Sequence, residues 1–124
     1  MDENVEEMKM LKKAMEEIAL YCDNGLDTPI SLSLYLQIFD ITDPAVKDKL
    51  IKKSKELIST ADDPQKLTVK DFQHEFHKIA SQISIEPDET APTVYIVNWI
   101  GMYAVPEVYP LGVRFKRELE ALDM

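Results

Sequence analysis

The chain has 124 residues, of which 45% are hydrophobic and 30% are charged, and this balance is that of a folded domain and not of a disordered segment. Its 23 acidic and 14 basic side chains give a net charge of −9, which argues against direct binding to the phosphate backbone of DNA or RNA. Three residues are glycine, so few turns with positive φ are available for β-hairpins, and the composition favours helices.

The first 22 residues carry the clearest helical pattern. Apolar side chains recur at alternating spacings of three and four residues, which predicts an amphipathic helix over residues 2–22 with a narrow apolar seam. A seam of about two heptads is short for an independent coiled coil, so self-association through residues 8–22 is one hypothesis and packing within the monomer is the other. Cys22 lies on the seam beside Asp23, and we expect a packed, unreactive thiol. The seam consists of Met8, Leu11, Met15, Ile18 and Cys22.

Residues 30–38 allow two interpretations. Apolar side chains alternate along the whole segment, which is typical of a strand with one buried face. Thr28 and Pro29 precede it as a capping hydroxyl and a first-turn proline, which favours a helix buried on most sides. We expect the helix. The alternative is an α+β domain with a small sheet that pairs residues 30–38 with residues 93–97.

Two further helices follow, each with a recognisable start. Residues 42–44, with the sequence Thr-Asp-Pro, begin a helix that runs to about Ser59. Thr68 begins the next helix, with Asp71 at its third position in a capping-box arrangement. The apolar stripe of this second helix has near-ideal helical spacing and consists of Val69, Phe72, Phe76, Ile79, Ala80 and Ile83.

The second half of the chain alternates between proline-containing connectors and apolar segments. Residues 84–92 contain two prolines and several acidic side chains, which predicts an exposed connector. Residues 93–105 form the most apolar stretch, which is too short to cross a bilayer and is expected to be buried. Residues 106–110 begin and end with proline and predict a rigid connector, followed by a terminal helix over residues 111–122. We therefore expect a single all-α domain over residues 1–124, an irregular bundle of five or six helices.

Three aromatic side chains of the apolar stretch would share one helix face. Tyr95, Trp99 and Tyr103 recur every four residues, so a helix aligns them. Aromatic residues with polar tips are ordinary core residues near a boundary, and they are also enriched in pockets and interfaces. This stripe is our first candidate for a pocket or an interaction site.

Other candidate sites are weaker. Five lysines lie between positions 47 and 55, and Lys49, Lys52 and Lys53 are candidates for a basic docking patch, although a solvated helix face is the simpler interpretation. His74 and His77 are three residues apart, whereas the zinc-protease helix needs four, so we expect no metal site. The sequence shows no pattern for catalytic residues, for a phosphate-binding loop or for another cofactor site.

These features favour a small acidic cytoplasmic protein that binds another protein and is not an enzyme. Inhibitors, immunity proteins, antitoxins and assembly chaperones act in this way, by covering a surface of a partner. The negative charge favours a partner with a basic surface, and it disfavours nucleic acid. We expect no membrane association. The alternative hypothesis is a small-molecule-binding or sensing domain with an aromatic pocket around Trp99.

Overall fold

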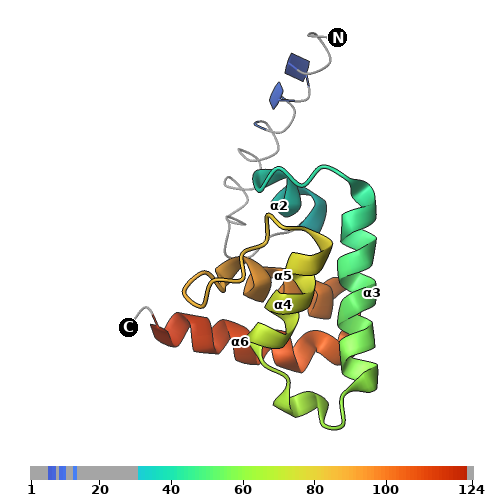
Figure 1. Ribbon diagram of the computed structural model, residues 1–124, viewed down its shortest axis with the longest axis vertical. Helices are drawn as coiled ribbons and strands as arrows, with labels where there is room; N and C mark the ends of the chain where they lie inside the picture. The colour runs from blue at the N-terminus through green and yellow to red at the C-terminus, as the bar shows by residue number, and fades with distance from the viewer. Residues whose placement is uncertain (1–5, 8, 11–12, 14–30, 123–124) are drawn as a thin grey trace.

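The computed structural model describes residues 6, 7, 9, 10, 13 and 31–122. Residues 31–122 fold into five α-helices and two short 3₁₀ turns (Figure 1). In chain order these elements are α2 (Leu32–Ile38), α3 (Pro44–Thr60), η1 (Pro64–Lys66), α4 (Val69–Ile79), α5 (Ala91–Tyr103), η2 (Pro106–Val108) and α6 (Tyr109–Leu122). The five described residues before position 14 are helical, and the described part of the chain contains no β-strand.

The all-α prediction is confirmed, and the α+β alternative is wrong. Both segments that would have formed the small sheet are helical, residues 32–38 in α2 and residues 93–97 in α5. The alternating pattern of α2 arises because this helix is buried on most of its circumference, with Leu34, Tyr35 and Leu36 buried in succession and Ser33 exposed.

Several predictions concern residues outside the described part of the chain. The helix predicted over residues 2–22 is described at five positions only, so its apolar seam and self-association through residues 8–22 lie outside the described residues. The same holds for the environment of Cys22 and for the helix start at Thr28 and Pro29.

Short polar side chains set the beginnings of the helices. At α2 the hydroxyl oxygen of Ser31 accepts a hydrogen bond from the backbone N–H of Leu34 at 3.2 Å. At α3 a carboxylate oxygen of Asp43 accepts one from the backbone N–H of Ala45 at 2.9 Å. At α4 the backbone N–H of Thr68 donates to Oδ2 of Asp71 at 2.8 Å, which confirms the predicted capping box. These bonds satisfy N–H groups that have no partner within their helix.

The helix α4 ends four residues before the end of its predicted apolar stripe. Ile83 is nevertheless buried, because the chain beyond the helix folds back onto α4. His77 Nδ1 lies 2.7 Å from the carbonyl oxygen of Ile83, and the buried amide of Gln73 donates to the carbonyl oxygens of Glu86 and Glu89 at 3.0 and 3.3 Å. Two side chains of α4 therefore hold the acidic connector that leads to α5.

The helix α6 begins two residues earlier than predicted. Residues 106–108 form a 3₁₀ turn, and the helix continues directly from Tyr109. Pro110 lies in the first helical turn, where its missing N–H interrupts no hydrogen bond. The predicted rigid connector is thus a tight turn into α6.

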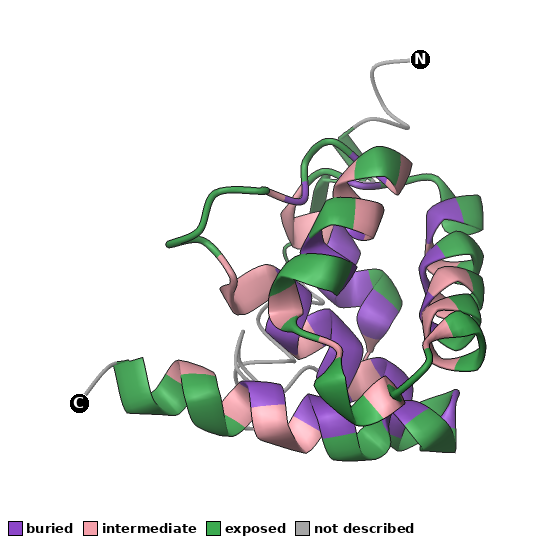
Figure 2. Cartoon of the chain, turned by 60° about the horizontal axis from the view of Figure 1, so that its bottom comes forward, coloured by how far each residue is buried: buried purple, intermediate pink, exposed green. Residues whose placement is uncertain are grey.

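The helix α5 lies at the centre of the bundle, with α4 in front of it and α6 below it in Figure 1. Seven of its 13 residues are buried, in keeping with its apolar sequence, and buried segments lie at the centre of the molecule in Figure 2. The rings of Phe72, Phe76 and Phe115 pack edge to face with centroid distances of 5.9 and 5.7 Å, and they join α4 to α6. The length of α5 is 13 residues, and no described helix combines the length and apolar character that a membrane span requires.

Two glycines allow α5 and α6 to approach closely. A methyl group at Gly101 would lie 2.6 Å from Cα of Tyr109, and one at Gly112 would lie 2.9 Å from Cα of Asn98. Both glycines are buried. Since the opposing atoms belong to the backbone, the two helices are in contact at these positions with no side chain between them.

Arg114 connects α6 to the segment before α4. Its two terminal guanidinium nitrogens donate to the carbonyl oxygens of Gln65 and Leu67, which are 49 and 47 residues away in sequence. Its Nε lies 3.4 Å from a carboxylate oxygen of Glu118, one turn later in α6. The planar guanidinium thereby fixes the η1 turn against α6.

Adding a methyl group at either glycine should destabilise the protein. We expect Gly101→Ala and Gly112→Ala each to lower the free energy of unfolding by about 1–3 kcal/mol, because the new Cβ meets backbone atoms of the other helix. The same change at an exposed helical site stabilises a helix by about 1 kcal/mol. Urea unfolding followed by circular dichroism measures the difference, with Lys55→Ala on the exposed side of α3 as the control, expected within about 0.5 kcal/mol of wild type. Unchanged stability of both glycine variants would contradict the close contact.

Removing a buried hydroxyl from α5 should stabilise the protein. Thr93 is fully buried, and its Oγ1 has no hydrogen-bond partner among the residues that the structure describes. Thr93→Val keeps the shape of the side chain, so we expect a gain of about 1 kcal/mol in the free energy of unfolding. Ser54 is the matched control, because its equally buried hydroxyl donates to the carbonyl oxygen of Leu50 at 2.9 Å and Ser54→Ala should bring no gain. A loss of stability in Thr93→Val would show that its hydroxyl is satisfied.

Candidate functional site

The predicted aromatic stripe lies along one side of α5 and becomes more exposed towards its end. Tyr95 and Trp99 are half-buried and pack against the core, whereas Tyr103 is 57% exposed. The rings of Tyr95 and Tyr35 lie edge to face at 6.3 Å, and those of Trp99 and Tyr103 lie at 5.4 Å. Tyr95 and Trp99 therefore lie at the edge of the core, whereas Tyr103 lies on the surface.

Lys47 of α3 completes the surroundings of Trp99. Its Nζ lies 5.3 Å from the centre of the indole ring, a cation–π distance. The indole thus contacts a tyrosine of its own helix and a lysine of another. Neither of the two grooves described below is lined by Tyr95, Trp99 or Tyr103, and the hypothesis of an aromatic pocket around Trp99 stays a prediction.

The predicted basic patch on α3 is mixed in charge. Lys49 and Lys52 are exposed, whereas Lys53 is half-buried and its Nζ lies 3.2 Å from a carboxylate oxygen of Glu56. Asp48 is exposed on the same helix. Acidic side chains thus dilute the basic charge of this patch, which resembles the solvated face that was the simpler interpretation.

The two histidines lie on α4 in different environments. The His77 ring lies against the carbonyl oxygen of Ile83, just before the connector, and His74 is exposed at a groove between α3 and α4. Among the described residues, no three His, Cys, Asp or Glu side chains lie close enough together to hold a metal ion.

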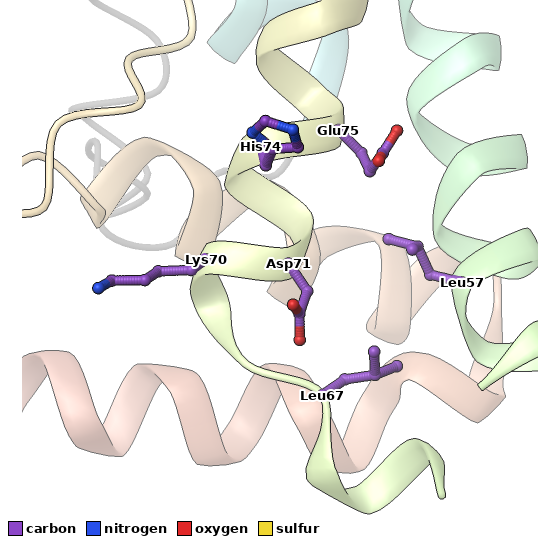
Figure 3. Close-up of a pocket in the computed structure, with 6 residues that line it drawn as sticks. All are labelled: Leu57, Leu67, Lys70, Asp71, His74 and Glu75. Atoms are coloured by element: carbon purple, nitrogen blue, oxygen red, sulfur yellow. The ribbon is translucent and has the colours of Figure 1, made fainter. Parts of the chain in front are cut away.

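The α3–α4 groove is a wide depression of about 470 Å³ (Figure 3). In Figure 3 the Asp71 carboxylate lies above Leu67, Glu75 lies higher on α4 towards α3, and the Lys70 side chain extends to the other side of α4. Asp71 accepts hydrogen bonds from the backbone N–H and the hydroxyl of the capping Thr68, and Glu75 lies 3.3 Å from the ammonium nitrogen of the lysine at position 78. Both carboxylates therefore already stabilise α4.

Three large exposed apolar side chains belong to the stretch where α5 leads into α6. Met102, Tyr103 and Tyr109 are 53%, 57% and 50% exposed. We call these three residues the α5–α6 surface. Its side chains belong to the last turn of α5 and the first turn of α6, directly beside the glycine contacts.

A second groove runs along the two helices from this surface. It has a volume of about 310 Å³, and we call it the α5–α6 groove; it is lined by Asn98, Met102, Tyr109, Val113, Lys116, Arg117 and Glu120. The sequence patterns did not identify this site. The start of α6 at Tyr109 places that residue and Val113 one turn apart on one face, and the sequence predicted a later start.

Comparison of the chain with protein-family models, curated proteins and solved structures finds no match. The evidence for a site is therefore the exposure and chemistry of the chain's own residues. The α5–α6 surface and the adjoining groove combine exposed apolar side chains with charged side chains that serve no described helix cap.

Polar substitutions on the α5–α6 surface should leave the fold intact. Met102→Ser and Tyr109→Ser should each change the free energy of unfolding by less than about 1 kcal/mol, because half of each side chain already lies in water. Phe72→Ala, at a fully buried aromatic residue, should cost about 3–5 kcal/mol in the same urea titration. If the surface variants lost as much stability as Phe72→Ala, these side chains would belong to the core.

Proposed function

We propose that the protein is a non-enzymatic, cytoplasmic protein-interaction module that covers a surface of a partner protein through its α5–α6 surface. The observation that carries the proposal is that Met102, Tyr103 and Tyr109, each half or more exposed, end α5 and begin α6, and that Met102 and Tyr109 line one groove. Single exposed apolar residues are ordinary on a soluble protein, whereas grouped ones mark interaction sites. Tyrosine and methionine are also enriched in protein interfaces.

The close contact between α5 and α6 keeps this surface ordered, which favours binding. The backbone contacts at Gly101 and Gly112 hold α5 against α6 directly below the exposed side chains. The neighbouring Trp99 is fixed between Tyr103 and Lys47. A surface that is already ordered loses little conformational entropy when a partner binds, so more of the contact energy remains as affinity.

Charge supports a partner whose surface is basic overall. The chain has a net charge of −9, and the connector that α4 holds in place exposes Glu86, Asp88 and Glu89 without a basic residue between them. Long-range attraction would accelerate the encounter with a basic partner, and added salt would weaken that attraction. An inhibitor, an immunity or antitoxin-type protein and an assembly chaperone would all use such a surface.

An affinity pull-down from lysate of the source organism tests the proposal. The tagged full-length protein should retain one dominant partner in near-equal amount, and less of it after a wash at high salt. The double variant Met102→Ser/Tyr109→Ser should lose about tenfold or more of that partner, because central aromatic and methionine contacts contribute a large share of binding energy.

The matched control is Ile85→Ser, which removes an equally exposed apolar side chain (50%) from the connector and should retain the partner. Equal retention by wild type and by the double variant would exclude the α5–α6 surface as the binding site. A wild-type protein that captures no partner would count against an interaction module altogether.

A further inference from the structure

We infer that the α5–α6 groove binds an acidic, amphipathic segment of the partner, one that presents carboxylates next to large apolar side chains. The inference rests on the proposed function and names the chemistry that this groove accepts. The protein as a whole is acidic, so the affinity for an acidic segment would come from the local charge of this groove and not from the net charge.

The groove has the shape of a site for a peptide segment. Its α6 side is formed by residues that recur every three or four positions from Tyr109 to Glu120, and its α5 side by Asn98 and Met102, one turn apart. Eleven helical steps correspond to a length of about 16 Å, which suits about three turns of a bound helix. Met102, Tyr109 and Val113 give it an apolar half.

The other half of the groove is cationic. Lys116 and Arg117 line it, and neither forms an ion pair with another described residue, whereas Arg114 on the same helix is engaged by two carbonyl groups and by Glu118. Glu120 is the one acidic residue of the lining, so the groove carries a net positive charge. Guanidinium and ammonium groups select carboxylates, and arginine can bind one through two parallel hydrogen bonds.

Asn98, a largely buried residue of α5, also lines the groove. It is 7% exposed, and its side chain forms no hydrogen bond with another residue of the described part of the chain. Its side chain can therefore meet a ligand that enters the groove. It can donate to and accept from the backbone or a carboxylate of a bound segment. The α3–α4 groove has no such feature, because its carboxylates are engaged within α4.

Opposite charges at different places would orient the partner. The acidic connector and the net charge attract a surface that is basic, and the α5–α6 groove accepts a carboxylate-bearing segment of that same partner. Such complementary patches favour one docking orientation over the others, because like charges meet when the partner is turned.

Two synthetic peptides test the inference with the full-length protein. Both are 14-residue helix-forming peptides with leucines at the same positions, and they differ in carrying glutamates or lysines beside those leucines. Titration into ¹⁵N-labelled protein should shift the amide signals of Met102, Tyr109, Val113, Lys116 and Arg117 with the glutamate peptide. The lysine peptide should bind about tenfold more weakly or not at all.

Charge reversal supplies the matched variants. Lys116→Glu/Arg117→Glu should weaken the glutamate peptide about tenfold and strengthen the lysine peptide, whereas Lys49→Glu/Lys52→Glu makes the same change of charge on α3 and should do neither. Lys49, Lys52 and Arg117 are exposed and Lys116 is half-buried, and thermal unfolding checks that each variant is folded. Equal affinity for the two peptides, or signal shifts that avoid the groove, would overturn the inference.

Two further outcomes separate this inference from the proposed function. If sedimentation shows that the protein alone forms a dimer that Lys116→Glu/Arg117→Glu dissociates, a second copy occupies the groove and the inference is wrong. The second outcome is that the charge-reversed protein keeps its pull-down partner while Met102→Ser/Tyr109→Ser loses it. The proposed interaction function would then be supported, and the inference that the groove binds an acidic segment of the partner would be wrong.

Discussion

The contact between the backbones of α5 and α6 is the constraint on which the rest of the described fold depends. At Gly101 and Gly112 no Cβ separates the helices, so their distance is set by backbone atoms and not by side chains that could repack. This contact fixes the course of α6 below α4. Phe115 then reaches the ring of Phe72, and Arg114 reaches the carbonyl groups of the segment before α4. The core and the η1 turn are thus organised from one helix pair.

The same contact explains why apolar side chains remain exposed at this place. Met102 and Val113 directly follow the two glycines, and Tyr109 supplies the backbone that Gly101 touches. Because the helices already meet at their backbones, the side chains beside the contact have no interior space to enter. They line the groove on the outside, over a support that cannot collapse beneath them. A tight core contact and an open apolar surface are therefore two consequences of one arrangement.

Local chemistry made much of the fold predictable from the sequence, and tertiary contacts account for what was missed. The caps at Asp43 and Thr68 act within three residues, and they set the starts of α3 and α4 where the sequence predicts them. The predicted end of α4 was wrong, because Ile83 is buried by a reversal of the chain that His77 contacts. In the sequence, a buried reversal has the same apolar pattern as one more helical turn. The aromatic stripe was aligned correctly, but exposure separates Tyr103 from Tyr95 and Trp99, and spacing contains no information about exposure.

The groove was out of reach for a different reason. Its two sides lie on different helices, and the glycines that join them form no motif in the sequence, because their meaning depends on which backbone they face.

The distribution of charge argues that the net value is a poor guide to the site. Residues 31–122 contain 14 acidic and 11 basic side chains, a net charge of −3, so most of the −9 belongs to the two ends of the chain. Within the described part, several carboxylates are engaged locally: Asp43, Asp63 and Asp71 cap helices, and Glu56 and Glu75 pair with lysines. Lys116 and Arg117 form no ion pair with another residue of the described part of the chain. These two cations are therefore available to a partner, and they line the same groove as Met102 and Tyr109.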